Sequence, residues 1–176
     1  MKKLIPLFLV VLVMLTGCTG KGSDDNGALN ATMPEIITQL YKGVDAPAYE
    51  AIELTEENFE YYAYIPYADD LTGYQADALI NAVPHSLVLV RSENGDAADL
   101  AQKMLDNADA RKWICVAADV KQTAYTEHYV ILVMSSAEIV EGVLANFETA
   151  VNDGAVTTLD AVLSGEAADN GEPVAD

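Results

Sequence analysis

The fold of this chain is decided by Tyr129-Val130-Ile131-Leu132-Val133-Met134, a stretch that is apolar on both faces a β-strand would present. Such a strand has to be covered on both sides, so we expect it at the centre of a sheet. A second apolar run, Ser86-Leu87-Val88-Leu89-Val90, predicts another buried strand. These two runs fix the interior from which the rest of the domain is built.

The segments around these runs follow helical and strand periodicities. Residues 96–108 predict a helix, with apolar side chains at helical spacing along one side. Residues 113–120 predict a strand because the even positions are all apolar, and residues 121–127 predict a polar turn. We expect Trp113 in the core because it begins this strand and adjoins Cys115, which is expected to be buried. After the 129–134 run, Ser135 and Glu138 have capping-box spacing. The helix that follows has its apolar side chains at Ile139, Val140, Val143, Leu144 and Phe147.

The N-terminal part of the domain adds two helices and a tyrosine-rich segment. Thr32 and Glu35 have capping-box spacing and precede an apolar helical stripe. Leu54 and Phe59 are spaced as a hydrophobic staple around a shorter helix beginning at Thr55. The segment 61–74 holds five tyrosines, which can stack on sugars or pack a loop onto the core; we favour packing.

The order strand-helix-strand-strand-helix predicts an α+β fold. A strand-helix-strand step favours a parallel crossover between 86–90 and 113–120, and the short turn after it favours an antiparallel hairpin. We therefore expect a mixed, mostly antiparallel sheet of three to four strands, packed against helices on one face. The N-terminal segment would partly cover the other face, and residues 76–83 give a weaker signal for an edge strand.

The N-terminus carries a lipoprotein export signal. Lys2 and Lys3 precede an apolar run over 4–15, and Leu15-Thr16-Gly17-Cys18 follows as a small-residue cleavage site that ends in a thiol. The run is shorter than the ~20 residues of a membrane-spanning helix, which indicates a removed signal rather than an anchor. We expect Cys18 to be alkylated by a diacylglyceryl group and to become the first residue of the mature protein.

This signal and the composition predict four regions. Residues 1–17 are the signal peptide, 18–31 the lipidated cysteine and a flexible tether, 32–151 the α+β domain and 152–176 an acidic, disordered tail. The localisation that follows is the outward, extracytoplasmic face of the cell membrane, with attachment through the acyl chains.

The net charge excludes several partners. The sequence holds 9 basic and 28 acidic residues, a formal charge of −19, and loss of Lys2 and Lys3 with the signal makes it −21. Such a charge repels phosphate backbones and anionic headgroups, so nucleic acid is not expected as a partner and contact with the membrane is expected only through the lipid. An envelope protein partner stays open.

Most of the domain resembles a known family, and three short strings carry the resemblance. The strings His85-Ser86-Leu87-Val88-Leu89-Val90-Arg91, Gly95-Asp96 and Arg111-Lys112-Trp113-Ile114-Cys115-Val116 are similar to those of small lipoproteins of Gram-positive bacteria. These proteins carry a single domain without assigned activity behind the lipid-attachment cysteine. The similarity covers roughly residues 33–151. It implies an α+β domain at the cell surface and supplies no catalytic residues.

The remaining candidate residues do not assemble a catalytic or metal site in the sequence. His85 and His128 could meet near strand ends with Asp119 or Glu127, but they lack the close ligand spacing of a zinc site. Adjacent residues on a strand point to opposite faces, so His85 and Ser86 cannot pair as a catalytic dyad.

Two further side chains have structural interpretations. Arg91 could hold an anion near a helix N-terminus, although pairing with a local carboxylate is favoured. Cys115 sits in an apolar string and is expected to behave as a small buried hydrophobe.

The sequence therefore predicts a membrane-anchored lipoprotein whose domain is a non-enzymatic binding or interaction module. We expect no catalytic residue, no cofactor and no metal, and one modified side chain, Cys18. The alternative is a small envelope hydrolase or a metal-dependent enzyme.

Overall fold

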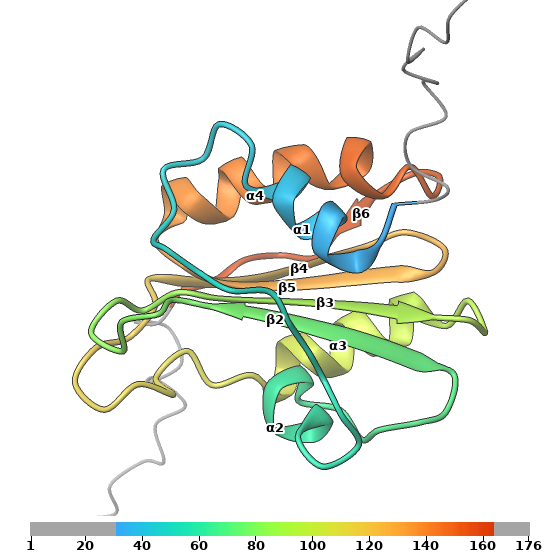
Figure 1. Cartoon of the computed structure of the whole chain (residues 1–176), viewed down its shortest axis with the longest axis horizontal. Coiled ribbons are helices and arrows are strands. Elements are labelled where there is room, and N and C mark those ends of the chain that lie inside the picture. The colour runs from blue at the N-terminus through green and yellow to red at the C-terminus, as the bar shows by residue number, and fades with distance from the viewer. Residues whose placement is uncertain (1–30, 164–176) are drawn as a thin grey trace, which may run out of the picture.

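The computed structural model describes residues 31–163, and these form helices on both sides of one β-sheet (Figure 1). The predicted signal, Cys18 and the tether up to residue 30 lie outside the described residues, as do residues 164–176. In chain order the elements are α1 (Met33–Leu40), β1 (Ile52–Glu53), α2 (Phe59–Ala63), β2 (Leu71–Asp77), β3 (Ser86–Ser92), α3 (Ala97–Asn107), β4 (Val120–Tyr125), β5 (Tyr129–Ser135), α4 (Ala137–Val151), β6 (Thr157–Thr158) and β7 (Val162–Leu163).

The sheet runs in the order β1-β2-β3-β5-β4-β6, with β7 also paired to β4, and every pair is antiparallel. The α+β class is confirmed, and β5 is central as expected: Leu132 lies opposite Val88 on one side and Thr123 on the other. The expectation of a mixed sheet of three to four strands is wrong. Within the described chain the sheet has seven strands, three of them only two residues long and so too short to show an alternating pattern.

The strand-helix-strand step places β3 and β4 in the same direction, but they are not neighbours because β5 pairs between them. β2 covers Leu71–Asp77 and lies between β1 and β3, so the strand signal at 76–83 was placed too late and wrongly given an edge position. Polar and aromatic side chains in this segment hid the alternation that marks its buried positions.

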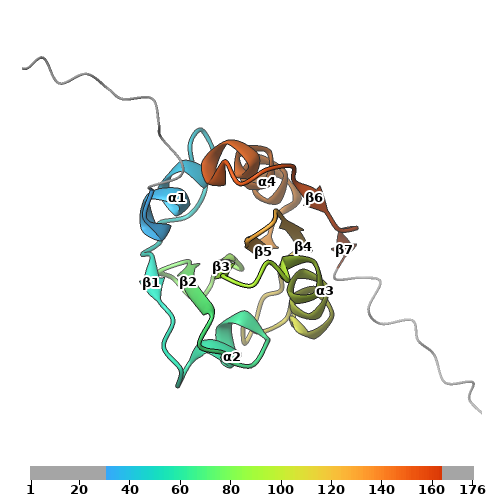
Figure 2. The same cartoon turned by 90° about the vertical axis from the view of Figure 1, so that its right-hand side faces the viewer.

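The helices form two layers, one on each face of the sheet (Figure 2). α1 and α4 cover the face to which β5 contributes Ile131 and Val133, whereas α2 and α3 cover the face to which it contributes Val130 and Leu132. The expectation that the helices share one face is therefore wrong. A central strand that is apolar on both faces needs a layer of helices on each side.

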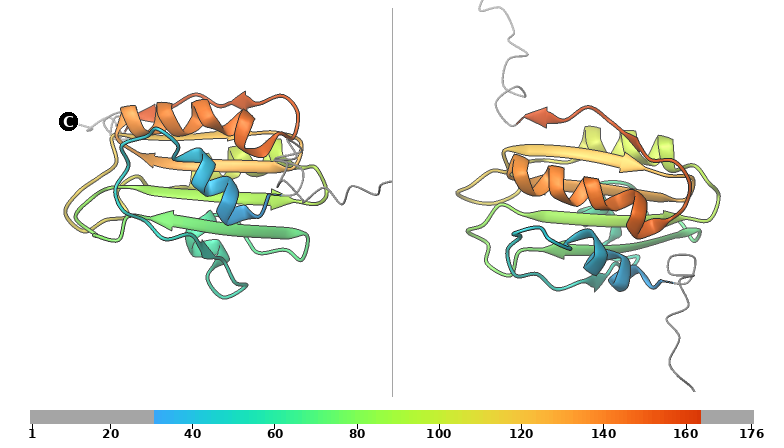
Figure 3. Two further views of the ribbon diagram at one scale, coloured as in Figure 1. Left: turned by 45° about the horizontal axis from the view of Figure 1, so that its top comes forward. Right: turned by 90° about the horizontal axis from the view of Figure 1, so that it is seen from above.

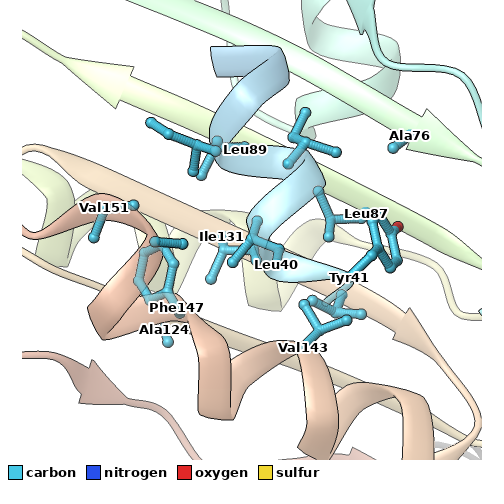
Figure 4. Packing of buried hydrophobic residues seen from close by; sticks show 14 of the residues in the cluster. Leu40, Tyr41, Ala76, Leu87, Leu89, Ala124, Ile131, Val143, Phe147 and Val151 are labelled. Carbon is cyan, nitrogen blue, oxygen red and sulfur yellow. The ribbon is translucent and has the colours of Figure 1, made fainter. Parts of the chain in front are cut away.

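The core under α1 and α4 is closely packed (Figure 4). Leu40 of α1, Phe147 of α4 and Ile131 of β5 meet there with no exposed surface. The predicted capping box starts α1: the Thr32 amide donates to Glu35 Oε2 at 2.7 Å. α4 instead begins after Ser136, so the capping box predicted at Ser135 and Glu138 is wrong because Ser135 is the last residue of β5.

The fold continues beyond residue 151, the domain boundary expected from the sequence. β6 and β7 both pair with β4, so residues 157–158 and 162–163 belong to the sheet. The low hydrophobicity after Val151 reflects an exposed sheet edge rather than the end of the domain. Within residues 31–163, no helix combines the length and apolar character that crossing a membrane requires.

The predicted strand over 113–120 is the largest error, because most of this segment is a loop and β4 begins only at Val120. β4 occupies most of the predicted polar turn. Two of its polar side chains donate to backbone carbonyls: Lys121 Nζ to Leu105 O and Ala108 O at 2.7 Å each, and Gln122 Nε2 to Leu159 O at 2.9 Å. The buried Thr123 hydroxyl has no hydrogen-bond partner among the described residues. Polarity therefore marked hydrogen-bonded strand residues, not a turn.

The displaced strand changes the environment of two residues that were expected in the core. Cys115 is exposed, and its neighbour Ile114 has no burial at all, with 101% relative exposure. Trp113 is only half-buried and packs against the edge of the core under α2 and α3.

We expect Cys115 to react readily in the native protein. In a chain of residues 19–176, which retains every described residue, Cys115 is the sole cysteine. An aromatic disulfide reagent should modify one thiol per molecule without denaturant, because exposure gives the reagent direct access. A matched control carries Cys115→Ala and Ala124→Cys, which moves the thiol to a fully buried position and should react only on unfolding. Modification of Cys115 that needed urea would restore the buried interpretation.

Candidate ligand-binding cleft

A cleft of about 540 Å³ opens at one end of the sheet. Its lining residues come from β2 and the β2–β3 loop, from the loop between α3 and β4, and from α2. The two loops lie toward the left of Figure 1, and α2 lies below the sheet. Its wall includes Tyr61, Tyr62, Trp113 and Ile114, and charged side chains are present as well. The volume is within the ~300–1,000 Å³ that small-molecule sites commonly occupy.

The charged part of the cleft is an ion pair between Lys112 and Asp77. Lys112 Nζ donates to Asp77 Oδ2 at 2.8 Å and to Ser86 Oγ at 2.9 Å. Asp77 and Ser86 face each other across β2 and β3, so the strand register places both acceptors beside one ammonium group. The side chains of Lys112 and Asp77 are 15% and 26% exposed, which leaves part of the pair accessible from the cleft.

Aromatic rings surround this ammonium group. Lys112 Nζ lies 5.7 Å from the ring centroid of Tyr62 and 5.3 Å from that of Trp113. Both distances allow a cation–π attraction, in which the negative face of the ring is turned toward the charge. Tyr61 and Tyr62 meet edge to face, with centroids 4.8 Å apart and planes at 90°. The rings of Tyr62 and Trp113 therefore already have a cation beside them, which is the Lys112 ammonium group.

Several apolar side chains around the opening of the cleft are exposed to solvent. Ile114 and Tyr61 are 101% and 71% exposed, and Leu79 and Ile80, on the β2–β3 loop that also lines the cleft, are 61% and 65% exposed. Single exposed apolar residues are common and need no explanation. Their concentration on adjoining segments around one cleft is typical of a surface that binds something.

Behind the cleft, His85 is part of a buried hydrogen-bonded cluster. Its Nε2 lies 2.7 Å from the Tyr41 hydroxyl and its Nδ1 lies 3.0 Å from Ser135 Oγ. Burial lowers the pKa of His85 to about 4, with Asp77 raising it and Lys112 lowering it to lesser extents. Both ring nitrogens are engaged and the ring is fully buried, so His85 stabilises the end of the sheet rather than serving a ligand.

The two histidines do not meet. His85 lies beside Ser135, at the end of β5, whereas His128 precedes the start of β5 and places Nδ1 3.1 Å from Asp153 Oδ1. Neither Asp119 nor Glu127 joins them in a shared site. Across residues 31–163, no three His, Cys, Asp or Glu side chains are grouped in a way that could hold a metal ion.

Arg91 forms the pairing that its sequence context favoured. Its Nη1 lies 3.3 Å from Glu93 Oε1, in an exposed ion pair. An exposed pair of this kind contributes at most about 1 kcal/mol to stability.

The tyrosine-rich segment packs on the core only in part. Tyr64 and Tyr62 pack partly against the core, but Tyr61 is mostly exposed and lines the cleft.

The cleft was not predicted, because assigning residues 113–120 to a strand removed the loop that forms it. One local signal was available. Asp109 accepts a hydrogen bond from the Arg111 amide at 2.9 Å, an arrangement that aspartate commonly supports in turns. Together with the basic pair Arg111-Lys112, Asp109 indicates a turn after α3, so that the next strand begins later in the sequence.

No family model, curated protein or solved structure was found to match this chain.

We expect His85 to make the domain less stable in acid. The unfolded chain takes up a proton at His85 near pH 6.5, but the folded state does so only near pH 4. Stability should therefore fall as the pH falls through this window, by about 3 kcal/mol in all. His85→Gln keeps a polar side chain and removes the titration, so urea unfolding should show it less stable than wild type at pH 7, with the gap narrowing toward pH 4. Parallel pH profiles for the two proteins would contradict the assignment.

Proposed function

We propose that this protein is a membrane-anchored, extracytoplasmic lipoprotein whose domain is a non-enzymatic binding module. Cys18 is the proposed lipid attachment site, and the cleft lined by Tyr61, Trp113 and Lys112 is the proposed binding site. The observation that carries the proposal is this cleft, which holds the exposed Tyr61 ring, the half-buried Trp113 ring and an ion pair. Few polar groups placed within an aromatic wall are typical of ligand sites.

The arrangement of the elements suits presentation from a membrane. α1 begins at the end of the sheet opposite the β2–β3 loop, as two views show (Figures 1 and 3), and this loop lines the cleft. A tether that joins Cys18 to α1 would therefore approach the domain at the end far from the cleft. Attachment at this end would leave the cleft open to a ligand.

The alternative function, a small hydrolase or metal-dependent enzyme, has one contact in its favour. Lys112 Nζ lies 2.9 Å from Ser86 Oγ, as a lysine that activates a nucleophilic serine would. However, the same Nζ donates to Asp77, and an ammonium group paired with a carboxylate has no lone pair with which to accept the serine proton. Ser86 is also only 1% exposed, so a substrate would not reach it.

We expect Cys18→Ser to abolish lipid attachment. Metabolic labelling with a fatty acid should mark the wild-type protein and leave the variant unlabelled, because no other residue supplies the alkylated thiol at the cleavage site. Cys115→Ala is the matched control and should keep the label and the membrane fractionation. A labelled Cys18→Ser protein that stays with the membrane would refute the anchor.

We expect small fragments to bind at the cleft rather than elsewhere on the domain. Trp113 is the sole tryptophan of the chain, so its indole N–H gives a single NMR signal inside the site. Fragments that shift this signal in a diverse library should lose binding in Tyr61→Ala and retain it in Tyr67→Ala. Both tyrosines have exposed rings, but Tyr67 packs on Phe59 and does not line the cleft.

Two outcomes would count against this proposal. A library without any fragment that perturbs Trp113 would remove the cleft as a binding site. Turnover of an ester or amide substrate that is lost in Ser86→Ala and kept in Tyr67→Ala would place the hydrolase first.

A further inference from the structure

We infer that the cleft takes a neutral, polyhydroxylated ligand with an apolar face, which is the chemistry of an uncharged sugar. This inference rests on the proposed binding role of the cleft and names the class of molecule it recognises. It follows from three properties of the site: the balance of charge, the hydrogen-bonding groups that face the cleft, and the aromatic surface beside them.

The charge of the site disfavours ionic ligands of both signs. Asp77 and Lys112 neutralise each other at 2.8 Å, so the cleft presents one carboxylate and one ammonium group side by side. An anion would approach Asp77 on a chain of formal charge −19. A cation would compete for ring faces that already lie beside the Lys112 ammonium group. A ligand without net charge avoids both costs.

The hydrogen-bonding groups match hydroxyls. The Lys112 ammonium group has three N–H donors, of which two are given to Asp77 and Ser86, so one is left for a ligand. Asp77 Oδ1 is enclosed, but Oδ2, which accepts one hydrogen bond from Lys112, has a further lone pair for a ligand, and Asn81 adds an amide with both donors and an acceptor. A hydroxyl group donates and accepts at once and so can bridge such neighbours. A wholly apolar ligand would instead cover the ion pair without replacing its water.

The aromatic side chains of the cleft provide packing contacts in addition to the hydrogen bonds. Tyr61 and Trp113 line the cleft with rings that are at least partly exposed, and Tyr61 stands at 90° to Tyr62. A pyranose ring has a flat face of C–H groups that packs on such a ring, while its hydroxyls point outward from the edge. A volume of about 540 Å³ is sufficient for one or two sugar units.

The test is a glycan array that carries neutral, anionic and cationic oligosaccharides, probed with labelled protein of residues 19–176. It is followed by titration with cellotriose, a neutral sugar with C–H groups on both faces, read out by Trp113 fluorescence. We expect saturable binding to neutral glycans in preference to charged ones. Tyr61→Ala and Asn81→Ala should each weaken binding by about tenfold, as loss of one stacked ring or one amide contact does. Tyr67→Ala should change it less than about twofold.

The outcomes separate this inference from the proposed function. Preference for anionic or cationic glycans would overturn the neutral-ligand inference. Fragment binding at Trp113 without binding of any glycan, up to 50 mM cellotriose, would overturn the sugar and leave the cleft as a site for another class of ligand. If neither fragments nor glycans bind, the cleft is not the binding site and the proposed function loses its support. Equal loss of binding in Tyr61→Ala and Tyr67→Ala would show that the sugar binds elsewhere.

Discussion

The structure depends on a strand that has to be buried on both of its faces. Residues Val130 to Met134 of β5 have no exposed surface, and burial of each large apolar side chain contributes about 1.5–3 kcal/mol. A single helical layer would leave half of this strand in water. β3 and β4 therefore pair along its two edges, while α1 with α4 and α2 with α3 cover its two faces. The insertion of β5 between β3 and β4 follows from the same need.

The same arrangement generates the cleft at the end of the sheet. The chain leaves α3 at that end and returns as β4, and Lys121 ties the first residues of β4 to the last carbonyls of α3. The intervening loop has to bridge this tie without entering the core, which is already filled by β5 and its neighbours. Trp113 and Ile114 consequently lie at the margin, where they form a wall with Tyr61 of α2.

The buried interior of this fold could be predicted from the sequence, but its exposed end could not. Apolar runs such as 129–134 predicted the central strand because burial alone dictates their pattern. Lys121 misled because its charge suggested a turn, whereas its Nζ donates to the carbonyls of Leu105, in the last turn of α3, and of Ala108, just after it. Ser135 had the spacing of a helix cap, yet its hydroxyl lies beside His85, fifty positions earlier in the chain. The cleft was missed because its groups come from α2, β2, the β2–β3 loop and one misassigned loop, which lie far apart in the sequence.

The partly buried Asp77–Lys112 ion pair in the cleft needs a physical explanation. Taking two charges partly out of water costs free energy that their attraction does not reliably recover, and apolar side chains of similar size often stabilise a fold as well or better. Asp77 Oδ1, moreover, is buried and has no hydrogen-bond partner in the described chain, which adds a further cost. Stability is therefore a poor reason for this pair. Under the proposed function the pair would serve recognition instead, because a donor and an acceptor in a cleft that also holds the exposed Tyr61 ring can select a polar, uncharged ligand.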